Sequence, residues 1–211
     1  MKISAGLQEG GVVVGNAYDK YGSKNMLVRW IMNGFADRLS SLVTQVGPRT
    51  IHEVGCGEGY WVLDWNQQGL QARGSDFSQK VINLARENAQ SRNFSPDIFS
   101  ACSIYDIEPE RDSADLIVCC EVLEHLESPE AGLSALQRVV TNYLILSVPR
   151  EPLWCALNLV RGKYLDSRGN TPGHIQHWSQ KEFIKLATRY FDVVDVRAPL
   201  PWTMALCRAK R

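Results

Sequence analysis

Three glycines at alternate positions, Gly55, Gly57 and Gly59, directly follow a short apolar run that ends in Val54. Apolar and β-branched residues of this kind suit a buried parallel strand, and glycine lets the backbone turn tightly and approach a ligand closely. The aromatic and apolar residues at 60–65 predict a helix whose first N–H groups face the same ligand. The stretch therefore predicts a strand, a turn and a helix that together bind a small molecule.

Glu53 and the glycine spacing indicate what kind of molecule that is. A dinucleotide fingerprint reads G-x-G-x-x-G, which lets a pyrophosphate sit on the helix N-terminus, whereas this chain reads G-x-G-x-G. The carboxylate of Glu53 would repel a phosphate but attract a cation or an amine. The pattern favours a positively charged ligand without phosphate, and it disfavours a nicotinamide-dependent oxidoreductase.

Two later segments extend the pattern. Asp76 ends the next predicted strand, about 20 residues after the first, where an acidic residue binds a ribose diol. Residues 114–126 read A-D-L-I-V-C-C-E-V-L-E-H-L. Together with Glu53 and its glycines, these segments resemble the class I S-adenosylmethionine-dependent methyltransferases, whose first motif is E/D-x-G-x-G-x-G. The 114–126 segment is similar to the fourth-strand motif of the ubiquinone-biosynthesis-like (type 11) branch, and the likeness covers roughly residues 45–150.

The resemblance implies S-adenosyl-L-methionine as the cofactor and assigns roles around it. Glu53 should hold the methionine end. Gly55 and Gly57 should let the backbone approach, so that a β-carbon at either position would obstruct the cofactor. Asp76 should accept both ribose hydroxyls, with Phe77 against the adenine. A second interpretation of Asp76 is that it caps the helix that follows it.

The other cofactor candidates lie on separate segments of the chain. Ser103 stands where related enzymes often place an Asp that accepts the adenine amino group, which leaves the backbone N–H of Ile104 for adenine N1. Glu121 ends its predicted strand on the same rim as the glycine turn. Tyr18 and Tyr21 precede the first predicted helix and are candidates for contact with the methionine end. Packing on a surface helix is the alternative interpretation of both tyrosines.

The histidines are the candidates for the acceptor side. Methyl transfer from a sulfonium is an in-line displacement, so positioning and exclusion of water can supply the catalysis, and a general base helps only where the acceptor loses a proton. His125 follows a strand end and is expected to position or deprotonate the acceptor, with packing as the alternative. His174 and His177 are expected to contact an acceptor or to satisfy backbone groups. Their H-x-x-H spacing lacks a third ligand nearby, so no metal site is expected.

The order of elements brings these residues together. Alternating strand and helix signals predict an α/β fold, a parallel sheet with helices on both faces. We expect strands at 50–55, 70–75, 97–102, 114–120, 143–148, 190–196 and 203–209, and helices from a Ser23 cap to Gly47 and at 58–68, 78–92, 129–140 and 180–189. The resemblance implies a Rossmann-like seven-stranded sheet in the order 3-2-1-4-5-7-6 with an antiparallel last strand. Ligands of such a sheet lie beyond the carboxyl ends of its strands.

The whole chain, 1–211, is expected to be a single domain. Residues 1–47 form an N-terminal arm and helical cover, in which 1–17 are expected to be a loop or a mobile arm, and residues 48–149 form the cofactor-binding core. Residues 150–178 interrupt the alternation after the fifth strand and are a candidate substrate lid, or alternatively a surface insertion that only plugs the core. Residues 179–211 complete the sheet.

Composition limits the partners. The 23 basic and 23 acidic residues balance, which gives no indication of a nucleic-acid partner. No stretch is long enough for a membrane span and no signal peptide is recognisable, so a cytoplasmic location is expected. We therefore expect a methyltransferase for a small organic acceptor, at oxygen, nitrogen or carbon. The alternative is a catalytically inactive cofactor-binding partner or regulatory subunit, and the sequence leaves the oligomeric state open.

Overall fold

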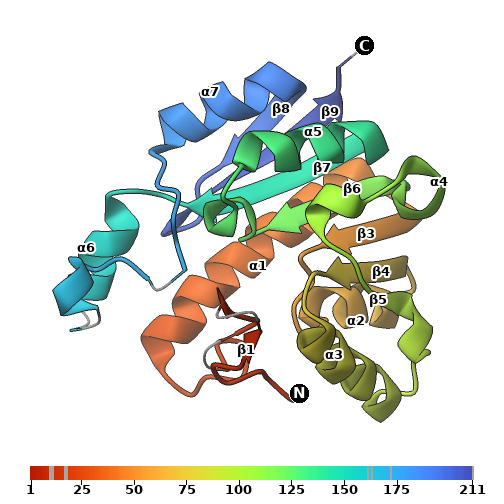
Figure 1. Cartoon of the computed structure of the whole chain (residues 1–211), viewed down its shortest axis with the longest axis horizontal. Coiled ribbons are helices and arrows are strands. Elements are labelled where there is room, and N and C mark those ends of the chain that lie inside the picture. Colours follow the sequence, from red (N-terminus) through yellow and green to blue (C-terminus); the bar gives the residue numbers. More distant parts are fainter. Residues whose placement is uncertain (10–11, 17–18, 161, 163, 172, 211) are drawn as a thin grey trace.

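A seven-stranded sheet forms the centre of the computed structural model, which describes residues 1–211 except 10–11, 17–18, 161, 163, 172 and 211 (Figure 1). Its strands are β3 (Thr50–Val54), β4 (Gln71–Asp76), β5 (Phe99–Ala101), β6 (Ala114–Cys120), β7 (Val140–Pro149), β8 (Phe191–Arg197) and β9 (Trp202–Ala209). They are arranged as β5-β4-β3-β6-β7-β9-β8, and β9 is antiparallel to both of its neighbours. Counted along the sheet strands alone, this is the expected order 3-2-1-4-5-7-6.

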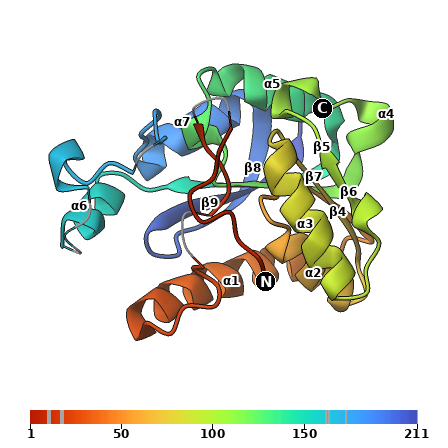
Figure 2. The same ribbon diagram turned by 60° about the horizontal axis from the view of Figure 1, so that its bottom comes forward.

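Helices cover both faces of the sheet. They are α1 (Met26–Val46), α2 (Tyr60–Gln67), α3 (Gln79–Ser91), α4 (Pro109–Asp112), α5 (Pro129–Val139), α6 (Leu153–Val160) and α7 (Gln180–Tyr190). Figure 2 shows α1 and α2 on one side of the sheet and α5 and α7 on the other. Each face has its own apolar core, because Leu39 of α1 and Leu63 of α2 belong to one buried cluster, and Leu136 of α5 and Phe183 of α7 belong to the other. The strands that carry the glycine turn and Asp76 are thereby held between two packed layers.

The first helix begins two residues later than the sequence predicted. The side chain of Asn25, and not that of Ser23, accepts hydrogen bonds from the backbone N–H groups of Leu27 and Val28. Asparagine is as good an N-cap as serine, and here it stands next to the first helical residue. The helix ends as predicted at Gly47, whose φ of 62° is the left-handed conformation that glycine adopts readily.

The N-terminal segment differs from the expected loop or mobile arm. Strands β1 (Gln8–Glu9) and β2 (Val12–Val13) form a small antiparallel hairpin. The segment is attached to the core on either side of this hairpin, because Ser4 and Asn16 both donate hydrogen bonds to the carboxylate of Glu58. Most of the segment is loop, as expected, and its attachment could not be expected because its partner, Glu58, lies in the glycine turn, far along the sequence.

Residues 150–178 form the insertion that follows β7. It contains α6 and a one-turn helix at Leu165–Ser167, and it returns to the sheet through a bridge between Arg150 and Trp178. In Figure 1, α6 lies at one side of the molecule, beyond the ends of the strands. No helix among the described residues combines the length and the apolar run that a membrane crossing requires.

Candidate active site

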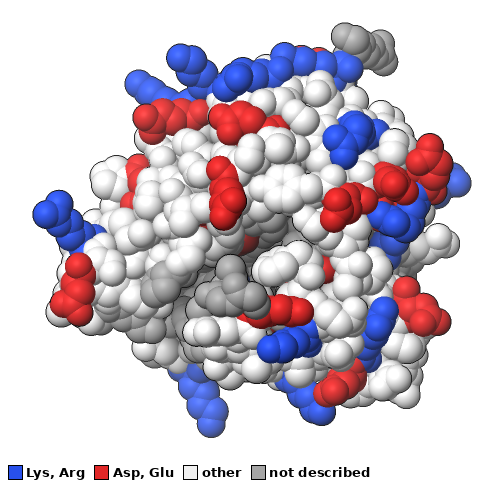
Figure 3. Space-filling view, viewed as in Figure 1, with Lys and Arg blue, Asp and Glu red and all other residues white. Residues whose placement is uncertain are grey.

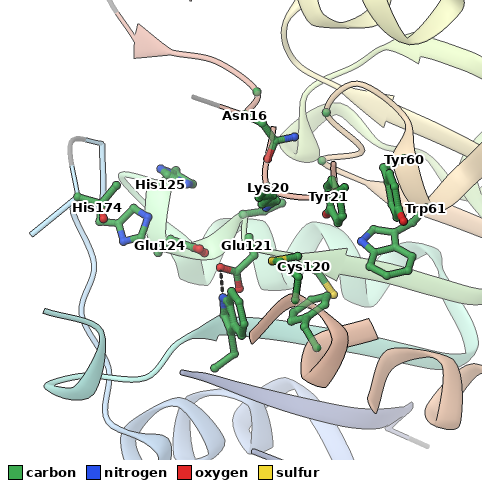
Figure 4. Close-up of a pocket in the computed structure, with 18 of the residues that line it drawn as sticks. Asn16, Lys20, Tyr21, Tyr60, Trp61, Cys120, Glu121, Glu124, His125 and His174 are labelled. Carbon is green, nitrogen blue, oxygen red and sulfur yellow. Dashed lines mark hydrogen bonds between the residues drawn. The ribbon is translucent and has the colours of Figure 1, made fainter. Parts of the chain in front are cut away.

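A cavity of about 430 Å³ lies at the carboxyl ends of β3, β4, β5 and β6. Figure 3 shows a hollow on this face of the molecule, and Figure 4 shows side chains that line it. The N-terminal segment, α1, the loops after the strands and the 150–178 insertion all contribute to its walls. Most of the residues that the sequence singled out therefore converge on a single space.

The glycine turn after β3 forms one wall of this cavity. Gly55, Gly57 and Gly59 have φ values of 80°, 53° and 83°, which L-residues rarely adopt. A β-carbon on Gly55 would lie 2.2 Å from a methyl group of Val122, whereas a β-carbon on Gly57 would meet no atom within 4 Å. That either change obstructs the cofactor stays a prediction. Both glycines line the cavity, but an added β-carbon would overlap Val122 at Gly55 and would extend into open space at Gly57.

Glu53 presents a buried carboxyl group to the cavity. The residue is 4% exposed, and its Oε2 has no hydrogen-bond partner among the described residues. Burial raises the pKa of this carboxyl well above its ordinary value, nearby Asp76 raises it further, and Lys20 opposes the change. An unpaired acid in a dry pocket is costly unless a cation or a donor reaches it. This orphaned oxygen fits the ammonium-bearing methionine end of S-adenosylmethionine.

Asp76 fixes the turn that it faces. Its Oδ2 accepts a hydrogen bond from the Gly57 N–H at 3.1 Å, and its Oδ1 accepts one from the Ser78 N–H at 3.0 Å. The cap of α3 is Ser78, whose Oγ accepts from the Val81 N–H, so Asp76 is not the helix cap. Each carboxylate oxygen keeps a second lone pair, and Asp76 lines the cavity, which suits a ribose diol.

The adenine side is only partly as expected. Phe77 is 56% exposed at the edge of the cavity and offers an open ring face. Ser103 does not line the cavity; its Oγ instead accepts a hydrogen bond from the Tyr105 N–H and begins a one-turn helix, Ile104–Asp106. Ile104 does line it, and as the first residue of that turn its N–H has no partner within the helix. Its contact with adenine stays a prediction, while nothing places the Ser103 side chain there.

Tyr21 belongs to an aromatic cluster beside the glycine turn. Its ring stacks on Tyr60 with centroids 3.7 Å apart and meets Trp61 edge-on at 5.7 Å. It also lines the cavity, so it packs and faces the site at once. Burial, with a smaller contribution from Glu53, raises the pKa of its hydroxyl well above the ordinary value, and the group is a neutral hydrogen-bonding partner. The other tyrosine, Tyr18, lies outside the described residues.

Glu121 directly follows β6 in a left-handed conformation, with φ 60°. Its Oε1 accepts a hydrogen bond from the Ser147 hydroxyl at 3.0 Å, and its Oε2 accepts one from the Trp202 indole N–H at 2.5 Å. Burial raises the pKa of the Glu121 carboxyl to about 7. The side chain lines the cavity between its two ends and is held from β7 and β9.

At the far end of the cavity from Tyr60, three side chains gather: Glu124, His125 and His174 (Figure 4). One nitrogen or oxygen from each lies within 4.8 Å of the others. Burial lowers the pKa of His125 below its ordinary value, and burial with the two neighbouring histidines lowers that of His174 to about 3. His177 is not part of this group, because its Nε2 lies 2.9 Å from the side-chain oxygen of Asn170. The H-x-x-H pair of the sequence is therefore divided between two environments.

Three charged residues of the site were missed in the sequence. Glu58, 1% exposed, binds the N-terminal segment, and hydrogen bonds from Ser4 and Asn16 overcome the effect of burial and lower its pKa. Glu124 is the buried acid of the histidine group. Lys20 projects into the middle of the cavity (Figure 4). Glu58 could have been noticed in the sequence, because it is an acid inside a glycine turn that is not expected to bind phosphate. Glu124 and Lys20 reach the cavity only through tertiary contacts, so no local sequence pattern indicates them.

A mostly parallel sheet of this order, with a glycine turn and two acids, Glu53 and Asp76, at the carboxyl ends of neighbouring strands, defines an α/β protein whose ligand site lies at this edge of the sheet. Comparison with known proteins agrees. Residues 52–144 match the methyltransferase domain family. The ubiquinone biosynthesis O-methyltransferase of Xanthomonas oryzae pv. oryzae is 27% identical over 155 residues, which are 72% of this chain and 62% of that protein. The chain thus spans less than two thirds of the length of this relative.

Solved structures show the same fold. Magnesium protoporphyrin IX methyltransferase from Synechocystis PCC 6803 with bound S-adenosylhomocysteine superposes with a TM-score of 0.66 at 20% identity, over 90% of each chain. The PH0226 protein from Pyrococcus horikoshii OT3 gives 0.68 at 17% identity, over 89% of this chain and 93% of that one. The comparisons thus give a match to a methyltransferase domain over residues 52–144 and the fold of these solved structures.

Proposed function

We propose that this protein transfers the methyl group of S-adenosylmethionine to a small organic acceptor. The observation that carries the proposal is the orphaned, buried carboxylate oxygen of Glu53 beside a glycine turn. A cation with hydrogen-bond donors would satisfy this oxygen, and a phosphate would be repelled by it. The similarity of the chain to an O-methyltransferase supports the same conclusion.

The residues of the cofactor end have separate tasks. Glu53 binds the charged methionine end, and the Gly57 backbone, held by Asp76, leaves room for the nucleoside. Asp76 offers its free lone pairs to the ribose, and Phe77 covers the adenine. When bound, the cofactor supplies a methyl group on a positively charged sulfur. The chain then has to bring an acceptor in line with that carbon and to exclude water.

The acceptor end is lined with aromatic rings. Trp154 of α6 stacks on His174 at 5.6 Å and meets Trp202 of β9 at 5.8 Å. Apolar walls with a few polar groups are typical of sites for small organic molecules. We infer that residues 150–178 cover the acceptor, because Trp154, Leu157 and His174 of this insertion line the cavity. A lid of this size suits a modest molecule better than a polymer.

A catalytically inactive cofactor-binding partner remains the second candidate function. It requires the space beside the methyl position to be filled by side chains of the insertion. The cavity of about 430 Å³ continues from the glycine turn to Trp154 and His174, which supports a site that takes both cofactor and acceptor. The enzyme is therefore the function that the geometry favours.

Titration calorimetry with S-adenosylhomocysteine tests the proposal. We expect saturable binding to the wild-type protein and a loss of about 100-fold in affinity for Glu53→Gln, because the neutral amide cannot pair with an ammonium group. Asp106→Asn is the matched control: its side chain lies on an exposed turn and does not line the cavity. Folded wild-type protein that binds no S-adenosylhomocysteine at hundreds of micromolar would rule the function out.

A further inference from the structure

We propose that His52 is a positioning residue for the cofactor: through the Ser75 hydroxyl it holds the glycine turn and Asp76 in the arrangement that binds S-adenosylmethionine. The inference deepens the proposed function and rests on it. Asp112, His52 and Ser75 form a hydrogen-bonded link beneath the cofactor end, and none of these three residues lines the cavity. The link would therefore act on the cofactor through the backbone that it holds.

His52 is bonded through both of its ring nitrogens. Nδ1 lies 2.7 Å from the backbone carbonyl oxygen of Asp112, the last residue of α4, and Nε2 lies 2.9 Å from the Ser75 hydroxyl. A carbonyl can only accept a hydrogen bond, so Nδ1 carries a proton. Burial lowers the pKa of His52 below its ordinary value, although the bond to Asp112 opposes the change, and the ring is neutral at neutral pH. Nε2 therefore accepts a hydrogen bond that the Ser75 hydroxyl donates.

The α4 end of the link is fixed independently of the histidine. The Asp112 carboxylate accepts hydrogen bonds from the Glu108 N–H at 2.8 Å and from the Arg111 guanidinium at 2.9 Å. The guanidinium of Arg73, on β4, donates to the Ser113 carbonyl at 2.8 Å. The end of α4 is thus a fixed point against which the strands are held.

Ser75 is the residue through which the link reaches the cofactor end. Its backbone carbonyl oxygen accepts hydrogen bonds from the N–H groups of Gly55 at 2.7 Å and Cys56 at 3.0 Å. The side chain of the next residue, Asp76, accepts one from the Gly57 N–H at 3.1 Å. Two consecutive residues of β4 therefore bind three consecutive N–H groups of the turn. A displacement of Ser75 would move both the turn and the acid that is expected to bind the ribose.

The link lies on the face of the sheet opposite to Glu53. In the β3–β4 pair, His52 is opposite Arg73 and Val54 is opposite Ser75, so the side chains of His52 and Ser75 share one face. Apolar residues would also fill this face, since Val54 belongs to its buried core. Hydrogen bonds are directional and apolar contacts are not, so the link fixes the relative position of the two strand ends more narrowly.

A purely structural role is the alternative, in which the link only attaches α4 to the sheet. Breaking the bond at either nitrogen of His52 would then lower stability and leave cofactor affinity unchanged. Two substitutions separate the bonds. Asparagine places an amide N–H near the position of Nδ1, so His52→Asn keeps the bond to Asp112 and loses the one to Ser75. Glutamine places its amide oxygen near the position of Nε2, so His52→Gln keeps the bond to Ser75 and loses the other.

Titration calorimetry with S-adenosylhomocysteine on the whole chain compares these variants. We expect His52→Asn to weaken binding by about 10-fold and His52→Gln, the matched control, to bind like the wild type, although urea denaturation should show similar stability losses in both. Ser75→Ala should also weaken binding by about 10-fold. The double variant should bind no more weakly than either single one, because both changes remove the same bond. Circular dichroism establishes that each variant is folded.

Native-state hydrogen exchange gives a readout at the turn itself. The amides of Gly55 and Cys56 should exchange faster in His52→Asn and Ser75→Ala than in the wild type and His52→Gln. Equal affinities of His52→Asn and His52→Gln, or wild-type affinity in Ser75→Ala, would overturn the positioning role, and Ser75→Ala decides alone where His52→Asn does not fold. If the wild type binds S-adenosylhomocysteine without these differences, only the positioning role fails. If folded wild-type protein does not bind it, the proposed function fails as well.

Discussion

The two ends of the cavity are built in different ways. At the cofactor end, Glu53, the glycine turn and Asp76 come from neighbouring strands β3 and β4, and Asp76 is already hydrogen-bonded to the turn. At the acceptor end, Glu124 and His125 follow β6, while His174 comes from the insertion after β7. The first is a local motif of adjacent strands, and the second exists only because a distant loop returns to the sheet.

The two ends of the cavity therefore place different requirements on the chain. Under the proposed function, the cofactor end needs a fixed backbone shape and one acid that can pair with a cation. The acceptor end places Glu124, whose carboxyl oxygens have no hydrogen-bond partner among the described residues, in a cavity with apolar walls formed by Trp154 and Trp202. A shared sheet carries the constant chemistry, and an insertion that loops over it carries the specific chemistry.

The largest expected effect is on stability, at Gly55 of the cofactor end. Comparison with Gly57 distinguishes a glycine needed for packing from one needed for cofactor binding. Gly55→Ala should lower the free energy of unfolding by about 3 kcal/mol, because it combines a strained left-handed residue with overpacking against Val122. Gly57→Ala, which meets no atom, should cost only about 1–2 kcal/mol of backbone strain but should weaken S-adenosylhomocysteine binding. Urea denaturation and calorimetry measure both quantities. Equal stability losses in the two variants would show that the turn packs differently.

The next prediction is that Glu53 lowers the stability of the protein at neutral pH although cofactor binding requires it. Because burial raises the pKa of this carboxyl, the folded protein holds its proton more tightly than the unfolded chain does. Stability is therefore fully present below the unfolded pKa of 4.5 and falls as pH rises towards the folded pKa. Glu53→Gln should remove that decline and raise the free energy of unfolding at neutral pH by about 1 kcal/mol, while cofactor affinity is lost. A variant that is destabilised at neutral pH would argue that Glu53 has a structural partner.

The third prediction concerns stability alone and the N-terminal segment, which lines the cofactor end. Glu58→Gln should reduce the free energy of unfolding by about 2 kcal/mol, because hydrogen bonds to a buried charge are lost. The pKa of Glu58 is lowered, so its contribution is present above the unfolded value of 4.5 and disappears as pH falls through the folded pKa. The difference between wild type and variant should therefore shrink below that pH. Glu87→Gln, which removes an exposed ion pair to Lys2 of the same segment, should leave stability nearly unchanged.

Much of the fold and of the cofactor end could be predicted from the sequence. The period of apolar residues gave the strand and helix order, and the spacing from Glu53 to Asp76 placed both acids at the same sheet edge, because parallel strands end on the same side. Failures at this end were local. Asn25 caps the first helix in place of Ser23, and the Ser103 hydroxyl accepts a hydrogen bond from the nearby Tyr105 backbone N–H. Short polar side chains have several nearby partners, and spacing alone does not choose between them.

The acceptor end could not be predicted in this way. The sequence left open whether His174 and His177 contact an acceptor or satisfy backbone groups; in the structure His174 lies beside Glu124, and His177 contacts the Asn170 side chain. The cause is a pair of backbone hydrogen bonds from residues 175 and 176 to Glu124, which no local pattern encodes. The ordered N-terminal segment was missed for the same reason, since its partner, Glu58, is distant in sequence.

The smallest predicted effect compares one aromatic ring from each end. Phe77→Ala should weaken S-adenosylhomocysteine binding by about 5-fold through lost stacking, with little change in stability, because the ring is 56% exposed. Trp154→Phe should leave that affinity unchanged but cost about 1 kcal/mol of stability, because the indole N–H of Trp154 donates to the Thr171 hydroxyl at 2.9 Å. If Trp154→Phe weakens cofactor binding as much as Phe77→Ala does, the two ends share one ligand, and the division between a cofactor end and an acceptor end is wrong.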